Sequence, residues 1–137
     1  MADTIQRTLR MSSPPDDVNS VHGHLESIWA HSPAISAVDR LSFELALIEL
    51  AGNVICHADS GSGVSFTLTI ETFADSIQAT VRDTGEPVDV ELTGRDMPGE
   101  LSESGRGIPL ITALVDEFAY DREGDLNHWR ITRKLLP

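Results

Sequence analysis

Three groups of residues have types and spacings that could do chemistry, and the first is a trio of polar side chains. Glu49, Asn53 and His57 follow one another at intervals of four, so on a helix each is rotated only about 40° from the last. A carboxylate and an amide one turn apart suit a hard cation such as Mg²⁺, and the acid could also act as a general base. Aliphatic neighbours predict a partly dry setting. On spacing alone, the trio could equally edge a solvent-facing surface.

The other two groups contain glycine. Asp83-Thr84-Gly85 stands where an alternating segment stops, although Asp and Gly end strands in many proteins. Gly105-Arg106-Gly107 opens a segment with helical spacing, where free backbone N–H groups and the helix dipole favour an anion. Glycine also lets a phosphate approach the backbone, and Arg106 adds positive charge to an acidic region. An ordinary glycine-rich helix start is the alternative.

Composition limits what these groups can do. The chain has 137 residues, and its 22 acidic residues against 10 basic ones give a net charge of −12. That charge argues against direct binding to nucleic acid or to a membrane surface. The single cysteine excludes an internal disulfide. The only lysine, Lys134, does not stand in a Gly-x-x-x-x-Gly-Lys-Ser/Thr stretch, so a phosphate-binding P-loop is excluded as well. We expect one domain over residues 1–137 and, because no signal peptide is recognisable, a cytoplasmic location.

The elements that must position these groups follow from periodicity. Strand–helix–helix–strand–strand–helix–strand–strand is the expected order, which predicts an α+β two-layer sandwich with a mixed, mostly antiparallel sheet and helices on one face. Ser12 and Ser13 are expected to cap the first helix. The second helix is expected to bury a stripe made of Leu41, Leu45, Ile48, Gly52 and Ile55. The predicted strands cover 4–11, 64–73, 77–83, 117–122 and 126–135, and the predicted helices cover about 14–31, 36–58 and 105–115.

The order of the three groups is more specific than any one of them. Residues 49–58, 83–85 and 105–111 resemble the N box, the first glycine box and the second glycine box of the GHKL (Bergerat-fold) ATP-binding superfamily. In particular, the chain resembles the anti-sigma-factor serine/threonine kinases of the RsbW and SpoIIAB type, and the resemblance covers nearly its whole length.

This resemblance assigns roles to the residues. It implies that Asn53 coordinates Mg²⁺ at the ATP phosphates and that Glu49 is the general base toward an acceptor hydroxyl. It implies that Asp83 accepts a hydrogen bond from the adenine amine and that Gly85 lets the base approach the backbone.

The phosphates have their own expected set. The resemblance implies that Gly105 and Gly107 line them, and we place His57 and Arg106 in the same nucleotide-binding group. The segment 86–104 would be the lid over ATP.

The resemblance also implies a function. At this length there is no room for the dimerisation domain of a histidine kinase, so we expect a free-standing protein serine/threonine kinase that uses ATP and Mg²⁺. Its implied partners are a sigma factor, which it sequesters, and a STAS-domain anti-anti-sigma protein, which it phosphorylates. Members commonly form homodimers, and we expect one here.

Three alternatives stay open. The acidic segment 86–104 and Pro87, where the family often has a second glycine, favour a non-catalytic partner-binding module with weak or no use of ATP. Glycine boxes with a purely structural role are a second possibility. A metal-dependent hydrolase built on Glu49 and His57 is the third, with less support because no second carboxylate cluster accompanies them.

Overall fold

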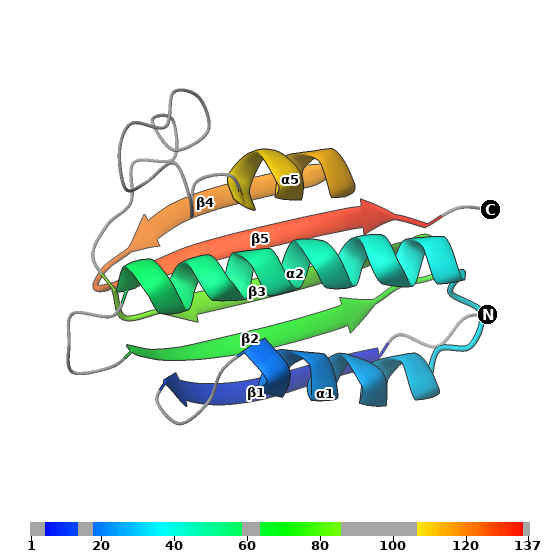
Figure 1. Cartoon of the computed structure of the whole chain (residues 1–137), viewed down its shortest axis with the longest axis horizontal. Coiled ribbons are helices and arrows are strands. Elements are labelled where there is room, and N and C mark those ends of the chain that lie inside the picture. The colour runs from blue at the N-terminus through cyan, green and yellow to red at the C-terminus, as the bar shows by residue number, and fades with distance from the viewer. Residues whose placement is uncertain (1–4, 14–17, 59–63, 86–106, 136–137) are drawn as a thin grey trace.

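One five-stranded sheet forms the base of the molecule. The computed structural model describes residues 5–13, 18–58, 64–85 and 107–135. The strands lie in the order β1-β2-β3-β5-β4, and three helices cover one face of the sheet (Figure 1). The strands are β1 (Ile5–Ser13), β2 (Val64–Thr72), β3 (Ser76–Asp83), β4 (Glu117–Glu123) and β5 (Leu126–Lys134), and the helices are α1 (Val18–Ala30), α2 (Ala37–Ala58) and α5 (Gly107–Leu114).

The predicted α+β two-layer sandwich is confirmed, with the predicted order of elements. The expected mixed, mostly antiparallel sheet is antiparallel in all four pairings among the described strands. Tight hairpins impose the antiparallel pairing of β2 with β3 and of β4 with β5. The second hairpin turns at Gly124, whose φ is 58°. Glycine adopts that left-handed conformation without the steric cost that other residues meet.

The core lies between the sheet and the helices. Alternate residues of each central strand point toward the helices, as in β3, where Ile77, Ala79, Val81 and Asp83 are buried. Trp129 and Ile131 extend the same layer from β5. The last of these buried residues of β3 is Asp83, so a carboxylate lies on the buried face of the sheet.

The buried side of α2 differs from the prediction. Leu41 and Leu45, expected in the core, are 59% and 43% exposed. The prediction was wrong for these two residues, whereas Ile48 and Ile55 of the same stripe are partly buried against the core. Because α2 is apolar around most of its circumference, two different stripes satisfy the spacing of three and four. Packing buries the stripe with the large Phe43 side chain. The buried residues of α2 are Asp39, Phe43, Ala46, Leu47, Leu50, Ala51 and Val54.

The role of Ser12 and Ser13 was also predicted wrongly. They belong to β1, where they pair with Ser65 and Val64 of β2, because the backbone ladder extends through both serines. The described part of α1 begins at Val18, and the predicted helix start at 14–17 lies outside the described residues.

Candidate functional site

Two of the three predicted groups come to one end of the molecule, together with the start of α5. The second half of α2, the end of β3 and the start of α5 all lie toward the left in Figure 1. Glu49 and Asn53 are on that half of α2, Asp83 is the last residue of β3, and Gly107 is the first residue of α5.

Asp83 is the most tightly held group of this end. It is only 1% exposed, and its Oδ1 accepts hydrogen bonds from the Gly85 backbone N–H at 2.8 Å and from Asn127 Nδ2 at 2.9 Å. Its Oδ2 accepts the indole N–H of Trp129 at 2.7 Å. The sheet register explains these contacts, because Asp83 lies opposite Asn127 and Trp129 is two residues further on the same face of β5. A buried carboxylate with three donors is stabilised as a fixed acceptor.

A second layer of contacts holds these donors. Arg122 donates through Nη1 to the Gly85 carbonyl at 2.7 Å and to Asn127 Oδ1 at 3.1 Å. The Tyr120 hydroxyl donates to the same oxygen of Asn127, and the Tyr120 ring lies 4.4 Å from that of Trp129. Because guanidinium groups only donate, the Asn127 amide must turn its oxygen to Arg122 and its nitrogen to the carboxylate.

The carboxylate of Asp83 fits the amine of an adenine base. A carboxylate offers about four acceptor positions, two on each oxygen. Oδ1 uses two of them, whereas Oδ2 uses one, for Trp129, within the described part of the chain. One acceptor position on Oδ2 is therefore left for a donor from a ligand. The backbone of Gly85 beside it carries no side chain that would block a flat ring.

Asn53 contrasts with Asp83. Its Nδ2 is buried and has no hydrogen-bond partner among the described residues. An unpaired buried amide costs about 1–3 kcal/mol, so it calls for an explanation. Glu49, half-buried, lies one helical turn before it. The amide fits the phosphate end of a nucleotide, because turned one way it offers N–H to a phosphate and turned the other way it offers an oxygen ligand to Mg²⁺.

The described residues contain no cluster of three His, Cys, Asp or Glu side chains that could hold a metal alone. Among the described residues, Asn53 could hold a cation together with oxygens of a ligand. This is the arrangement that the family resemblance implies for Mg²⁺.

The remaining predicted residues are placed only in part. His57 lies in the last turn of α2, and its side chain is outside the described residues. Gly105, Arg106 and the predicted lid, 86–104, also lie outside them, whereas Gly107 begins α5 as expected. Their predicted roles stay predictions.

The sequence also matches a known protein family. Residues 11–133 match the family described as the histidine kinase-like ATPase domain. The chain belongs to this family. Membership supports an ATP-binding, kinase-type function for the chain.

Several solved structures of similar fold come from histidine kinases. The catalytic domain of histidine kinase ThkA has a TM-score of 0.56 at 11% identity, over 93% of this chain and 97% of that one. The histidine kinase domain of the blue-light activated Erythrobacter litoralis EL346 protein has a TM-score of 0.54 at 22% identity, over 72% of this chain and 45% of that one. The Acinetobacter baumannii histidine kinase AdeS has a TM-score of 0.54 at 14% identity, over 94% of this chain and 68% of that one. At these identities the similarities show the shared fold.

No curated protein sequence matches the chain significantly. None of the described helices is long and apolar enough to cross a membrane.

Sequence reasoning missed three site residues of this histidine kinase-like ATPase domain. Asn127, Trp129 and Arg122 build the surroundings of Asp83, yet none belongs to a predicted motif. The alternation of β5 does place Asn127 and Trp129 on one face. Their meeting with Asp83 depends on the register between β3 and β5, which are distant in sequence.

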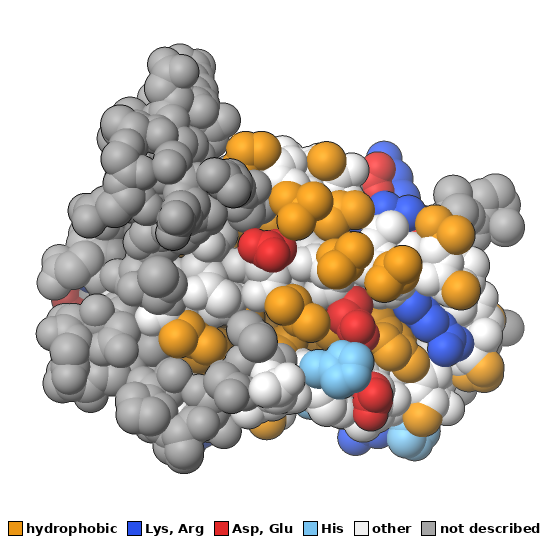
Figure 2. Space-filling view, in the orientation of Figure 1, with side chains coloured by type: hydrophobic (Ala, Val, Ile, Leu, Met, Phe, Trp, Pro, Cys, Tyr) orange, Lys and Arg blue, Asp and Glu red, His pale blue; other side chains and the backbone are white. Residues whose placement is uncertain are grey.

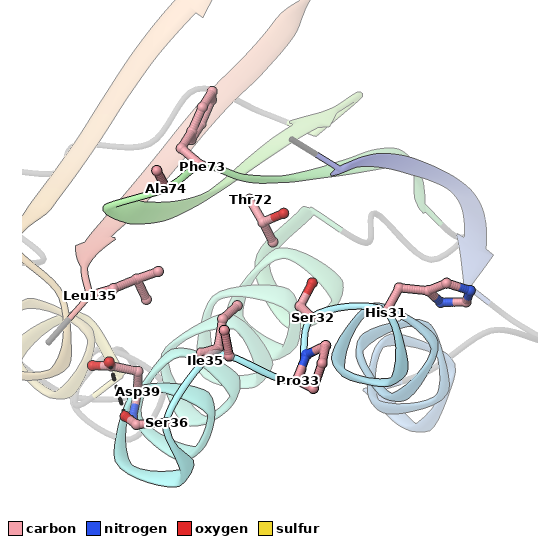
Figure 3. Close-up of a pocket in the computed structure, with 11 residues that line it drawn as sticks. His31, Ser32, Pro33, Ile35, Ser36, Asp39, Thr72, Phe73, Ala74 and Leu135 are labelled. Carbon is pink, nitrogen blue, oxygen red and sulfur yellow. Dashed lines mark hydrogen bonds between the residues drawn. The ribbon is translucent and has the colours of Figure 1, made fainter. Parts of the chain in front are cut away.

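The opposite end of the domain has a cavity of about 270 Å³. Residues from the α1–α2 connection, the β2–β3 turn and the end of β5 line it, among them Ile35, Phe73 and Leu135 (Figure 3). Asp39 also lines the cavity, and its carboxylate accepts hydrogen bonds from the Ser36 hydroxyl and from Arg133 Nε. None of the predicted site residues lies there, so this cavity is separate from the candidate site.

Proposed function

We propose that the chain is a Mg-ATP-dependent protein serine/threonine kinase that acts as an anti-sigma factor. It would phosphorylate a serine of a STAS-domain anti-anti-sigma protein and sequester a sigma factor, as a homodimer in the cytoplasm. The observation that carries the kinase proposal is the buried Asn53 Nδ2, one turn beyond Glu49, which has no hydrogen-bond partner among the described residues. In this pair, Asn53 is suited to a phosphate and its cation, and Glu49 is suited to an acceptor hydroxyl.

The residues divide the work of such a transfer. Asp83 and the Gly85 backbone would orient the adenine ring, and Asn53 would position the phosphates. Glu49 would take the proton of the acceptor hydroxyl. The oxygen of that hydroxyl would bond to the γ-phosphorus of ATP while the bond from this phosphorus to the β–γ bridging oxygen breaks, which releases ADP. Mg²⁺, held with Asn53, would offset the negative charge of the phosphates. Such a transfer depends mainly on positioning and charge, so no P-loop lysine is needed.

Replacing Glu49 tests the proposal. In the Glu49→Gln variant, phosphate transfer to candidate STAS-domain proteins should fall about 10²–10⁴-fold, the usual contribution of a general base. The affinity for Mg-ATP, measured by calorimetry, should stay close to that of the wild type. Glu117→Gln, which changes an exposed glutamate of β4, is the control and should transfer phosphate normally. Normal transfer by Glu49→Gln would remove Glu49 from this role.

One observation favours a second function, a partner-binding module that does not use ATP. Both oxygens of Asp83 already accept hydrogen bonds from the chain itself, so this carboxylate has a structural role without any nucleotide. Such a module should bind its partner equally well in EDTA without ATP, and its binding should weaken steeply with salt because the chain carries a charge of −12. A strict requirement for Mg-ATP in partner binding would contradict it.

A further inference from the structure

The helical face of the domain exposes a row of large apolar side chains. Val38, Leu41 and Leu45 of α2 are 59%, 59% and 43% exposed, and Leu110 of α5 is 41% exposed. We call these four residues the apolar stripe. They include all but one of the large hydrophobic side chains that are exposed in the described part of the chain. Figure 2 shows hydrophobic side chains gathered over α2 and α5. Contiguous exposed apolar surface with a polar rim is typical of a protein-interaction site.

The apolar stripe runs toward the candidate catalytic pair. Leu41, Leu45, Glu49 and Asn53 follow one another at intervals of four on α2. On a helix, successive members of such a row are about 6 Å apart and face nearly the same way. Leu110 belongs to the helix that begins at Gly107, in the second glycine box. A protein seated on the apolar stripe would therefore reach Glu49 within one helical turn of Leu45.

The surroundings of the apolar stripe are acidic. Glu44 and Glu49 flank Leu45 on its two sides around the helix. The Glu44 side chain is only 20% exposed and already contacts the His22 ring at 3.2 Å and the Trp29 indole N–H at 3.3 Å, so Glu49 contributes most of the acidic character here. Arg40 is the one Lys or Arg among the described residues of the three helices, and it is already engaged. It donates to the carbonyls of Ile35 at 2.9 Å and Ser32 at 3.0 Å. An apolar row between carboxylates complements an aliphatic ridge flanked by Lys or Arg.

We propose that the apolar stripe is the docking surface for the acceptor protein, which contacts it through a helix with an aliphatic ridge and basic flanks. This inference rests on the proposed kinase function, because it places the acceptor hydroxyl beside Glu49. A second copy of the chain fits less well, because it would bring the same carboxylates against Glu44 and Glu49. Like charges facing each other across an interface oppose binding.

The first test uses a synthetic amphipathic helix with a leucine ridge and lysine flanks, and the same helix with glutamates in place of the lysines. Titrated into the ¹⁵N-labelled full chain, the lysine peptide should shift the backbone amides of Leu41, Leu45 and Leu110 in NMR spectra. The glutamate peptide should bind at least about tenfold more weakly, a difference of about 1.4 kcal/mol. Shifts centred elsewhere, or equal binding of both peptides, would overturn the proposal.

A pair of charge variants at one position sharpens this test. Leu45→Glu and Leu45→Lys both remove the leucine contact, but Leu45→Lys should weaken binding of the lysine peptide more, and the gap should close at high salt. Phe73→Ser, which removes the exposed aromatic side chain at the opposite end of the domain, is the control and should bind the peptide normally. If the apolar stripe instead joins two copies, Leu45→Glu should dissociate a dimer in sedimentation, which would overturn the proposal.

Two arms separate this proposal from the kinase proposal. Peptide binding should persist in Asp83→Asn, in which nucleotide binding is expected to be lost, so a failed kinase assay does not decide the docking surface. Where phosphate transfer is observed, the lysine peptide should raise the KM for the acceptor protein and leave the KM for ATP unchanged. An unchanged KM for the acceptor would show that the acceptor docks elsewhere.

Discussion

The two ends of the candidate nucleotide site are built in opposite ways. Asp83, on the sheet, has three hydrogen-bond donors and is held through Asn127 and Trp129 of the neighbouring strand. Asn53, on a helix, keeps a buried amide nitrogen without a partner in the described part of the chain. We call these the Asp83 corner and the Asn53 corner. The carboxylate of the first already has three donors from the chain, whereas the second has a buried polar atom without a partner among the described residues, which a ligand could satisfy.

The difference predicts how stability and binding are linked. The hydrogen bonds of the Asp83 corner stabilise the fold and, under the proposed function, would also fix the acceptor for adenine, so one substitution should reduce both stability and binding. In the Asn53 corner, the buried nitrogen without a partner among the described residues would cost stability and would serve the ligand, so a substitution should separate the two. Natural proteins commonly break local rules of polar satisfaction at functional sites.

The largest effect on stability is expected for Asp83→Asn. The new amide nitrogen would face at least one of the three donors, leaving buried N–H groups without an acceptor. We expect the free energy of unfolding to fall by about 2–4 kcal/mol, because hydrogen bonds to charged groups are lost. Calorimetry should show Mg-ATP affinity reduced at least about 100-fold, or about 2.7 kcal/mol. Asp75→Asn, in the exposed β2–β3 turn, is the control for both measurements.

If Asp83→Asn loses stability but keeps its affinity for Mg-ATP, the Asp83 corner is structural only. That result would favour the partner-binding module over the kinase.

Trp129→Phe should have the second-largest effect. It removes the N–H that reaches Asp83 Oδ2 while keeping an aromatic ring against Tyr120. Urea denaturation should show a loss of about 1–2 kcal/mol, the contribution of one hydrogen bond to a charged group. Mg-ATP affinity should also fall, because the carboxylate is less firmly positioned. The matched control is Trp29→Phe, which removes a 3.3 Å hydrogen bond to Glu44 outside the site and should leave affinity unchanged.

The contrast between the corners also explains what the sequence could predict. Strand alternation and turn residues predicted the elements, and the spacing of Glu49 and Asn53 predicted a one-turn pair on α2. Asp83 was predicted as a site residue, but its partners Asn127 and Trp129 were not. Those contacts arise from the register between β3 and β5, which only the folded sheet determines.

The error at α2 has a similar cause. Leu41 and Leu45 have the spacing of a core stripe, but so do the residues around Phe43, and periodicity cannot decide between two apolar sides of one helix. Only packing against the sheet distinguishes them. Two residues that the prediction put in the core, Leu41 and Leu45, belong instead to the exposed apolar stripe, so the failure of the pattern at these positions marks a candidate interaction surface.

Asn53→Ala should separate binding from stability. Alanine removes the unpaired buried nitrogen and favours the helix, so the free energy of unfolding should stay the same or rise by about 0.5–1 kcal/mol. Mg-ATP affinity should nevertheless fall, and the variant should lose the difference that the wild type shows between magnesium and EDTA. Ser42→Ala, elsewhere on α2, is the control and should keep that difference. A clear loss of stability in Asn53→Ala would show that the amide has a structural role, and the contrast between the two corners would fail.

The smallest effect concerns His24, which tests whether an unpaired buried atom by itself indicates a ligand site. His24 Nε2 is also buried without a partner among the described residues. Burial lowers the pKa of His24 below 6.5 and the Arg7 charge acts in the same direction, whereas a hydrogen bond with the Arg7 backbone opposes them. Because the unfolded chain binds the proton more readily, stability should be full above pH 6.5 and fall as the pH drops toward the lowered pKa.

Urea denaturation on both sides of pH 6.5 measures this loss. His24→Gln should reduce it, whereas His31→Gln, which leaves His24 in place, should retain it. Mg-ATP affinity should be the same in His24→Gln as in the wild type, because the His24 side chain packs toward β1, away from the Asp83 and Asn53 corners. If His24→Gln did weaken Mg-ATP binding, a buried nitrogen without a partner would not by itself indicate the phosphate end of the site. The assignment of Asn53 to that end would then rest only on the position of Asn53 one turn beyond Glu49.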